Sequence, residues 1–232
     1  MRKLLAAAVL VALALGIAAW YTFYREVPQP AWITANPRDD FFYGSVEAER
    51  SAGLPFWIWL VLPRICADHL PGPGGYAALG RPWEQGKEMP VGFAKKTVGY
   101  VRVGGNCALC HAVSSRPGTE EVPLPVIAGP GQAADLRPLQ TFFARCAEDP
   151  HFNAADILSE IGMATKLSIR EHLLYRYVLI PRARRALLKQ STLIDPELQA
   201  HRQRPDAPFA TARMKGLAAW LQEQRRAGPL AY

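Results

Sequence analysis

The residues of this 232-residue chain that could do chemistry gather in one short run, residues 106–111, with the sequence Asn-Cys-Ala-Leu-Cys-His. Cys107 and Cys110 are three positions apart, so on a helical turn both sulfurs lie on one face and can form thioethers with the two vinyl groups of one haem edge. His111 follows directly and can ligate the iron. Asn106 can cap the turn. The run predicts one covalently attached haem c.

Chance is a poor explanation for this run. With four cysteines and five histidines in the chain, a random shuffle produces such a run with a probability of roughly 0.0015. Two other chemistries use a C-x-x-C pair. A thioredoxin-like dithiol follows a βα unit and does not need the histidine, and a zinc ribbon needs a second C-x-x-C that this sequence lacks. Haem c is therefore the leading prediction, with a dithiol or a zinc site as the alternatives.

Two cysteines remain outside the run, Cys66 and Cys146. In an oxidising compartment they could form a disulfide that closes a loop of about 80 residues and stabilises the fold by something over 4 kcal/mol on the chain-entropy model. The alternative is a pair of buried free thiols. The sequence alone does not show whether Cys66 and Cys146 form a disulfide or remain free thiols.

The sixth ligand of the iron decides what such a haem does. Methionine there raises the reduction potential, a second histidine lowers it, and an open position admits oxygen or peroxide. Met89, in a Glu-Met-Pro loop, is the named candidate for the distal ligand, with ordinary packing as its alternative. The other candidates that could reach the iron are Met163, Met214, His69 and His201, whereas His151 and His172 are typical of surface or capping positions.

The N-terminus predicts a membrane anchor. Residues 4–21 are apolar, Arg2 and Lys3 precede them, and Trp20, Tyr21 and further aromatic residues close the run. Eighteen residues are about enough to cross a bilayer, with the charges on the cytoplasmic side. A cleaved signal peptide with a Gly16-Ile17-Ala18 site is the alternative. Either interpretation exports the body, and we expect the bacterial inner membrane with the body in the periplasm.

Composition predicts a mainly α, loop-rich domain. Half of the residues are hydrophobic, enough for one sizeable core, while 20 prolines and 18 glycines indicate long loops. The predicted organisation is residues 1–24 as anchor or signal, 25–40 as a proline-bearing linker, and 41–232 as one cytochrome c-like haem domain. Within it, residues 54–62 form a buried core element, 98–103 an extended segment that leads into the haem turn, and 114–134 a loop.

Helix signals dominate the remainder. Asp135 caps a helix that carries Leu139 and Cys146, and Asn153 caps the next. Ser168 and Glu171 form a capping box, and Pro181 kinks or ends the helix that follows. A last amphipathic helix is predicted at about residues 211–226.

Positive charge is concentrated in the C-terminal third. Residues 1–150 hold 14 basic and 13 acidic side chains, and residues 151–232 hold 13 and 7. Such a face could dock an acidic redox partner protein, lie against anionic lipid, or neutralise haem propionates; a solvated helix face is the plain alternative. Export argues against nucleic acid as a partner.

Four stretches in this order resemble the N-terminal haem half of the rubber-oxygenase-type dihaem c cytochromes, distant relatives of dihaem cytochrome c peroxidases. They are residues 55–64, 70–80, 89–93 and 106–111, and the resemblance spans about residues 41–189. It implies a periplasmic haem domain in which Cys107 and Cys110 are thioether donors and His111 is the proximal ligand. The relatives are much longer and carry a second C-x-x-C-H, so a dihaem mechanism is not implied. The segment around Trp220 also resembles the terminal helix of class I cytochromes c.

Three functions are compatible with these patterns. The first is a membrane-anchored monohaem cytochrome that transfers single electrons, in which residues 56–59 keep the haem pocket dry. The second is a haem peroxidase or oxygenase with an open distal site, for which no residue stands out as a distal acid or base. The third is a non-catalytic haem subunit of a larger membrane complex.

Overall fold

A computed structural model describes residues 2–115, 124–127 and 135–189. The chain divides into two units, Met1–Ser191 and Thr192–Tyr232, and all described residues belong to the first. The described part is mainly helical, at 60%, as the sequence predicts. The predicted helix at residues 211–226 lies outside it.

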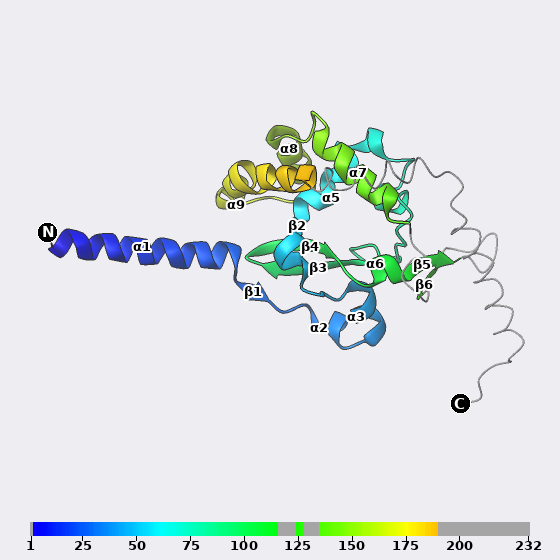
Figure 1. Cartoon of the computed structure of the whole chain (residues 1–232), viewed down its shortest axis with the longest axis horizontal. Helices are drawn as coiled ribbons and strands as arrows, with labels where there is room; N and C mark the ends of the chain where they lie inside the picture. The colour runs from blue at the N-terminus through cyan, green and yellow to red at the C-terminus, as the bar shows by residue number, and fades with distance from the viewer. Residues whose placement is uncertain (1, 116–123, 128–134, 190–232) are drawn as a thin grey trace, which may run out of the picture. The chain divides into compact units, whose positions relative to one another are not determined.

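The N-terminal apolar run forms one long helix, α1 (Arg2–Phe23), as expected (Figure 1). Its mean hydropathy reaches 2.3, and it is long and apolar enough to cross a membrane. None of its residues is buried by the rest of the protein. Trp20 and Tyr21 are more than half exposed at the end where aromatic residues favour the membrane surface.

The segment predicted as a linker, residues 25–40, contains ordered elements instead. They are β1 (Glu26–Val27), α2 (Ala31–Thr34) and the start of α3 (Pro37–Tyr43). The Asn36 side chain accepts a hydrogen bond from the backbone N–H of Arg38, and Pro37 occupies the first helical position. An Asn cap followed by proline is a strong helix start, so these local signals override the polar composition.

A four-stranded antiparallel sheet has the strand order β1-β3-β4-β2. Its centre is the hairpin of β3 (Phe93–Val98) and β4 (Tyr100–Gly105), with Phe93 opposite Gly105, and β2 is Leu54–Pro55. The extended segment predicted at residues 98–103 is therefore confirmed as β4. Its partner β3 was not predicted, because Lys95 and Lys96 interrupt its apolar pattern.

A helical layer covers one side of this sheet (Figure 1). Its main members are α5 (Phe56–Ile65), α7 (Arg137–Glu148) and α8 (Ala154–Ala164). Helix α5 contains the predicted core element, and Ile58, Trp59, Val61 and Leu62 in it are fully buried. Asn153 caps α8, as predicted, by accepting hydrogen bonds from the N–H groups of Ala155 and Asp156. The remaining short elements are α4 (Ala48–Ala52), η1 (Ala67–His69) and η2 (Gly75–Ala77).

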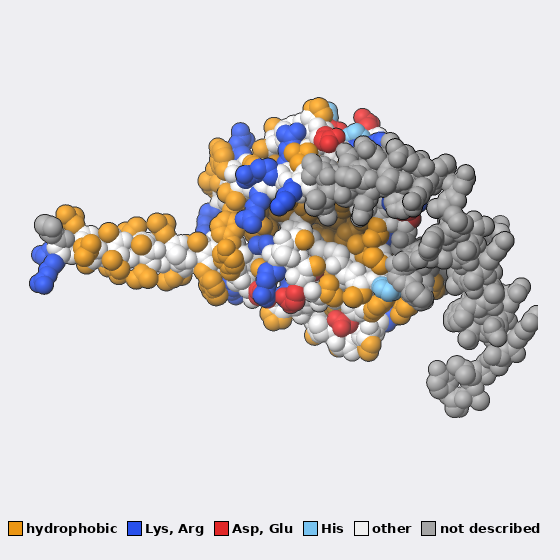
Figure 2. Space-filling view, viewed as in Figure 1, with side chains coloured by type: hydrophobic (Ala, Val, Ile, Leu, Met, Phe, Trp, Pro, Cys, Tyr) orange, Lys and Arg blue, Asp and Glu red, His pale blue; other side chains and the backbone are white. Residues whose placement is uncertain are grey.

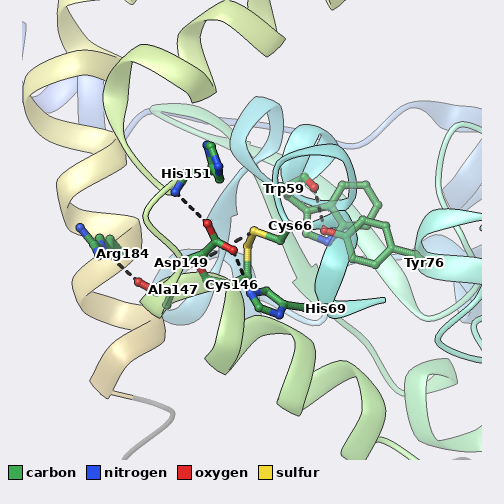
Figure 3. Close-up of a disulfide and its surroundings, with 9 residues drawn as sticks. All are labelled: Trp59, Cys66, His69, Tyr76, Cys146, Ala147, Asp149, His151 and Arg184. Carbon is green, nitrogen blue, oxygen red and sulfur yellow. Dashed lines mark hydrogen bonds and ion pairs between the residues drawn. A yellow bond between two sulfur atoms is a disulfide. The ribbon is translucent and has the colours of Figure 1, made fainter. Parts of the chain in front are cut away.

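Cys66 and Cys146 form a disulfide, which decides between the two alternatives for this pair (Figure 3). Cys66 directly follows α5 and Cys146 lies in α7, with Cα atoms 5.4 Å apart. Both are buried. Beside the bridge, Asp149 accepts a hydrogen bond from the backbone N–H of His151 and pairs with Nε2 of His69 at 2.8 Å. The disulfide thus joins two core helices under a small polar network.

The last helical segment of the described part runs without a break from residue 169 to residue 189. It begins as α9 (Ile169–Leu174) behind the predicted Ser168–Glu171 capping box, and passes through a π-helical turn, η3 (Tyr175–Leu179). Pro181 was expected to kink or end this helix; the helix does not end there and continues through residue 189. Proline has no N–H and crowds the carbonyl four residues earlier, and the wider π turn directly before it is where a helix can absorb that misfit.

Part of the predicted loop at residues 114–134 is a second hairpin. Strand β5 (Ala112–Ser115) pairs antiparallel with β6 (Leu124–Ile127). Residues 116–123 and 128–134 lie outside the described part. Because β5 starts directly after His111, the C-x-x-C-H turn is held between two hairpins.

Candidate haem-attachment turn

The C-x-x-C-H run forms a single helical turn, α6 (Ala108–His111), directly after β4. Cys107 has helical backbone angles, and its carbonyl accepts hydrogen bonds from the N–H groups of Cys110 and His111. The predicted helical geometry of the pair is confirmed, and both sulfurs belong to one turn.

Asn106 fixes the entry to this turn. Its side-chain oxygen accepts a hydrogen bond from the N–H of Ala108 at 3.0 Å, and its side-chain nitrogen donates to the carbonyl of Gly44 at 3.0 Å. Its own N–H donates to the carbonyl of Gly92. Asn106 is buried, so each of these bonds is shielded from water. The capping role predicted for Asn106 is confirmed, and the bond to Gly44 adds an anchor 62 residues away.

Two glycines leave room for the turn. Gly92 has φ +94°, and a Cβ there would lie 2.5 Å from the Cα of Leu109. A Cβ on Gly105 would lie 2.7 Å from Cδ2 of the same leucine. A side chain at position 92 would clash with the backbone of α6, whereas one at position 105 would displace the side chain of Leu109. The backbone around α6 is therefore packed closely against the loop that precedes β3.

Arg81 holds the other end of the turn and was not predicted from the sequence. Nη1 donates to the carbonyl of Leu109 at 2.9 Å, and Nη2 donates to the carbonyl of Asp135 at 3.1 Å. Burial lowers the pKa of Arg81, while the nearby Cys110 and Asp135 act in the opposite direction. Its Nε is buried without a hydrogen-bond partner in the described structure. No pattern in the sequence marks this residue, because its partners are 28 and 54 positions away.

The two cysteines of the turn remain free. Cys107 is exposed and Cys110 is partly exposed, and neither belongs to a disulfide. His111, the last residue of α6, is partly exposed. Thiols and an imidazole on one accessible turn are the donor set that haem c requires, and the buried unpaired N–H of Arg81, near Cys110, suits an anionic group such as a propionate. The residues present therefore fit the group.

Met89, the named candidate for the distal ligand, is buried at 6% exposure in the hydrophobic core. It lies three residues before Gly92, on the loop that contacts α6. Its role as a ligand stays a prediction.

The other candidates differ in accessibility. Met163 is 70% exposed, His172 is exposed, and His69 and His151 pair with Asp149 and Asp156. Met214 and His201 lie outside the described residues. Within the described ranges, no three His, Cys, Asp or Glu side chains gather into a metal-binding group, so a zinc site there would need further ligands.

Aromatic side chains fill the core behind the turn. The rings of Trp59 and Tyr76 stack at 4.3 Å, and Phe93 lies 5.3 Å from Trp59. Phe93 is opposite Gly105, which precedes Asn106. Trp59 of the aromatic segment 56–59 thus packs on Phe93 of β3, and the role of the segment in keeping a haem pocket dry stays a prediction.

No protein-family model, no curated protein and no solved structure matches this chain. The resemblance to the haem half of dihaem cytochromes rests on the sequence stretches alone.

Proposed function

We propose that the chain is a membrane-anchored monohaem c-type cytochrome that transfers single electrons. The observation that carries the proposal is the contrast among four cysteines. Two are buried in a disulfide, and the two of the C-x-x-C-H run are free on an accessible helical turn. The fold therefore uses one cysteine pair in a disulfide, and the other pair is available to attach a cofactor.

In this proposal Cys107 and Cys110 attach the haem and His111 ligates the iron. The group supplies an iron that takes up and releases one electron. The chain supplies a rigid seat: Asn106 and Arg81 fix the two ends of α6 by buried hydrogen bonds, and Gly92 lets the neighbouring loop approach. If the residues that hold α6 do not move when the charge on the iron changes, the reorganisation energy is small. A small reorganisation energy favours electron transfer.

Helix α1 is the anchor in this proposal, with the body in the periplasm of a bacterial inner membrane. Its length and hydropathy support a membrane span. The excess of basic over acidic side chains in residues 151–232 supports the proposal that the redox partner is an acidic protein.

The test is covalent haem content after denaturation. We expect the full chain, co-expressed with a haem-attachment system, to keep a haem-derived mass on the peptide that contains residues 107–111. The double variant Cys107→Ala/Cys110→Ala should lose it. The matched control, Cys66→Ser/Cys146→Ser, removes the same number of sulfurs and should keep it.

Two other outcomes would redirect the proposal. A wild-type chain without covalent haem, whose thiols at 107 and 110 cycle with a disulfide, would identify a dithiol oxidoreductase. A haem that is high-spin and binds carbon monoxide quickly would contradict simple electron transfer, because the iron would then have an open position.

A further inference from the structure

The helix at residues 169–189 has one face that stays exposed among the described residues. Its buried side packs into the core through Tyr175, Leu179, Ile180, Ala183 and Leu187. Three large apolar side chains on it remain in solvent: Ile169 is 81% exposed, Leu173 49% and Tyr177 68%. They are four positions apart, so they form one stripe along the helix. Exposed apolar side chains in a row mark an interaction surface.

Basic residues border this stripe, which we call the α9 stripe. Arg170 follows Ile169 directly, the guanidinium carbon of Arg176 lies 5.8 Å from the centre of the Tyr177 ring, and both arginines are exposed. Glu171 lies on the opposite face of the helix, where its carboxylate accepts hydrogen bonds from Ser168. Figure 2 shows basic side chains beside hydrophobic ones over this part of the molecule. An apolar stripe between arginines is typical of helices that lie in the head-group region of a membrane.

The helix at residues 169–189 lies near the C-terminal end of α1, and the β3–β4 hairpin connects the two. The hairpin turn at Gly99 is in contact with the backbone of Thr22 and Phe23. Next to it, Nη2 of Arg102 donates to the carbonyl of Phe23 at 3.0 Å. The Arg102 guanidinium also lies within electrostatic reach of Arg182, in the helix at residues 169–189, and of Tyr24. The helix that carries the stripe is thus close to the point where α1 leaves the apolar region.

We propose that the α9 stripe, with Arg170 and Arg176, docks onto anionic phospholipid head groups of the bilayer that α1 enters. This inference rests on the membrane anchor of the proposed function and is independent of the haem. Three apolar side chains are a small surface for a free protein. A chain already tethered at residue 23 docks intramolecularly, however, so a small surface is sufficient. Positive charge beside the apolar row selects anionic over neutral lipid.

The test is photo-cross-linking of the full chain in lipid nanodiscs. A benzoylphenylalanine replaces Tyr177, and in a second sample it replaces Arg145, an exposed residue of α7 away from the stripe. The nanodiscs contain phosphatidylcholine alone or phosphatidylcholine mixed with phosphatidylglycerol. We expect a lipid-adduct mass on the peptide with residue 177 that is roughly fivefold more abundant with phosphatidylglycerol, and none above background at 145.

Charge reversal separates docking from nonspecific proximity. Arg170→Glu/Arg176→Glu should reduce the lipid adduct at 177 to the background level, whereas the control Arg145→Glu should leave it unchanged. Equal adducts at 177 and 145, an adduct insensitive to charge reversal, or a cross-link from 177 to protein would each overturn the proposal. If the chain incorporates into nanodiscs but gives no lipid adduct, the docking fails while the anchor stands. If it does not incorporate, both fail.

Discussion

The two cysteine pairs of this chain have opposite surroundings. Cys66 and Cys146 come from sequence positions 80 apart, are fully buried, and join two core helices. Cys107 and Cys110 are three apart, share one short helical turn, and remain accessible as free thiols. The comparison shows that environment decides what a cysteine does: a buried pair stabilises the fold, and an exposed pair is available for chemistry.

Removing each pair should have different consequences for stability. Replacing Cys66 and Cys146 by serine opens a loop of 80 residues, so the free energy of unfolding should fall by about 4.5 kcal/mol on the chain-entropy model. Replacing Cys107 and Cys110 by serine in the haem-free chain should change it by less than about 1 kcal/mol, because Cys107 is exposed and neither is bridged. Urea unfolding of the haem-free variants measures both, and equal losses would remove the distinction between the pairs.

The second prediction concerns the seat of the accessible pair. Gly92→Ala places a Cβ at φ +94° and 2.5 Å from the Leu109 backbone. We expect a loss of about 3 kcal/mol in the free energy of unfolding, since strain and a backbone clash combine. Gly72→Ala, where nothing lies within 4 Å of the added carbon, is the matched control and should change stability little. If both variants unfold at the same urea concentration, the close approach of Gly92 to α6 does not contribute to stability.

A smaller effect is expected at Asn106. Asn106→Ala removes the acceptor for the Ala108 N–H and the donor to Gly44, and should cost about 2 kcal/mol, because one buried carbonyl then loses its partner. Asn106→Asp keeps the acceptor but places a buried carboxylate oxygen against the Gly44 carbonyl, so it should be at least as destabilising as the alanine variant. Chemical denaturation and the fraction of covalent haem give the two readouts. An alanine variant as stable as wild type would contradict a role for Asn106 in fixing the turn.

The smallest effect lies near the disulfide. A hydrogen bond with Asp156 raises the pKa of His151, and both side chains are exposed. The charged pair contributes fully below the ordinary histidine pKa of about 6.5 and is lost as the pH rises through the raised value in the folded protein. The urea midpoint of wild type should therefore decline slightly above that pH relative to His151→Asn. An NMR titration that places His151 at or below its ordinary pKa would contradict this.

The sequence predicted the features whose partners are close in the chain. The helical turn of Cys107 and Cys110, the Asn153 cap and the Ser168–Glu171 capping box each depend on residues three or four apart. Local hydrogen bonds of this kind form whatever the remainder of the chain does. The same reasoning, applied to Asn36 and Pro37, would have found α3, where the polar composition of residues 25–40 suggested a linker instead.

The contacts that hold the turn could not be predicted in this way. Arg81, Gly44 and Gly92 reach α6 from 15 or more positions away, and nothing in their local sequence indicates which backbone group each will meet. The sequence also left open whether Cys66 and Cys146 form a bridge, because that depends on how α5 and α7 pack. Tertiary packing decides these points, and it is encoded across the chain as a whole.

The order of the four cysteines has a consequence for maturation. The bridge joins the first cysteine to the last, and the C-x-x-C pair lies between them. If the body emerges from the membrane in sequence order behind α1, Cys66 meets Cys107 and Cys110 before its correct partner emerges. An oxidase acting on cysteines in order of appearance would therefore join the wrong sulfurs. Early capture of Cys107 and Cys110 by haem would leave Cys146 as the one thiol with which Cys66 can pair.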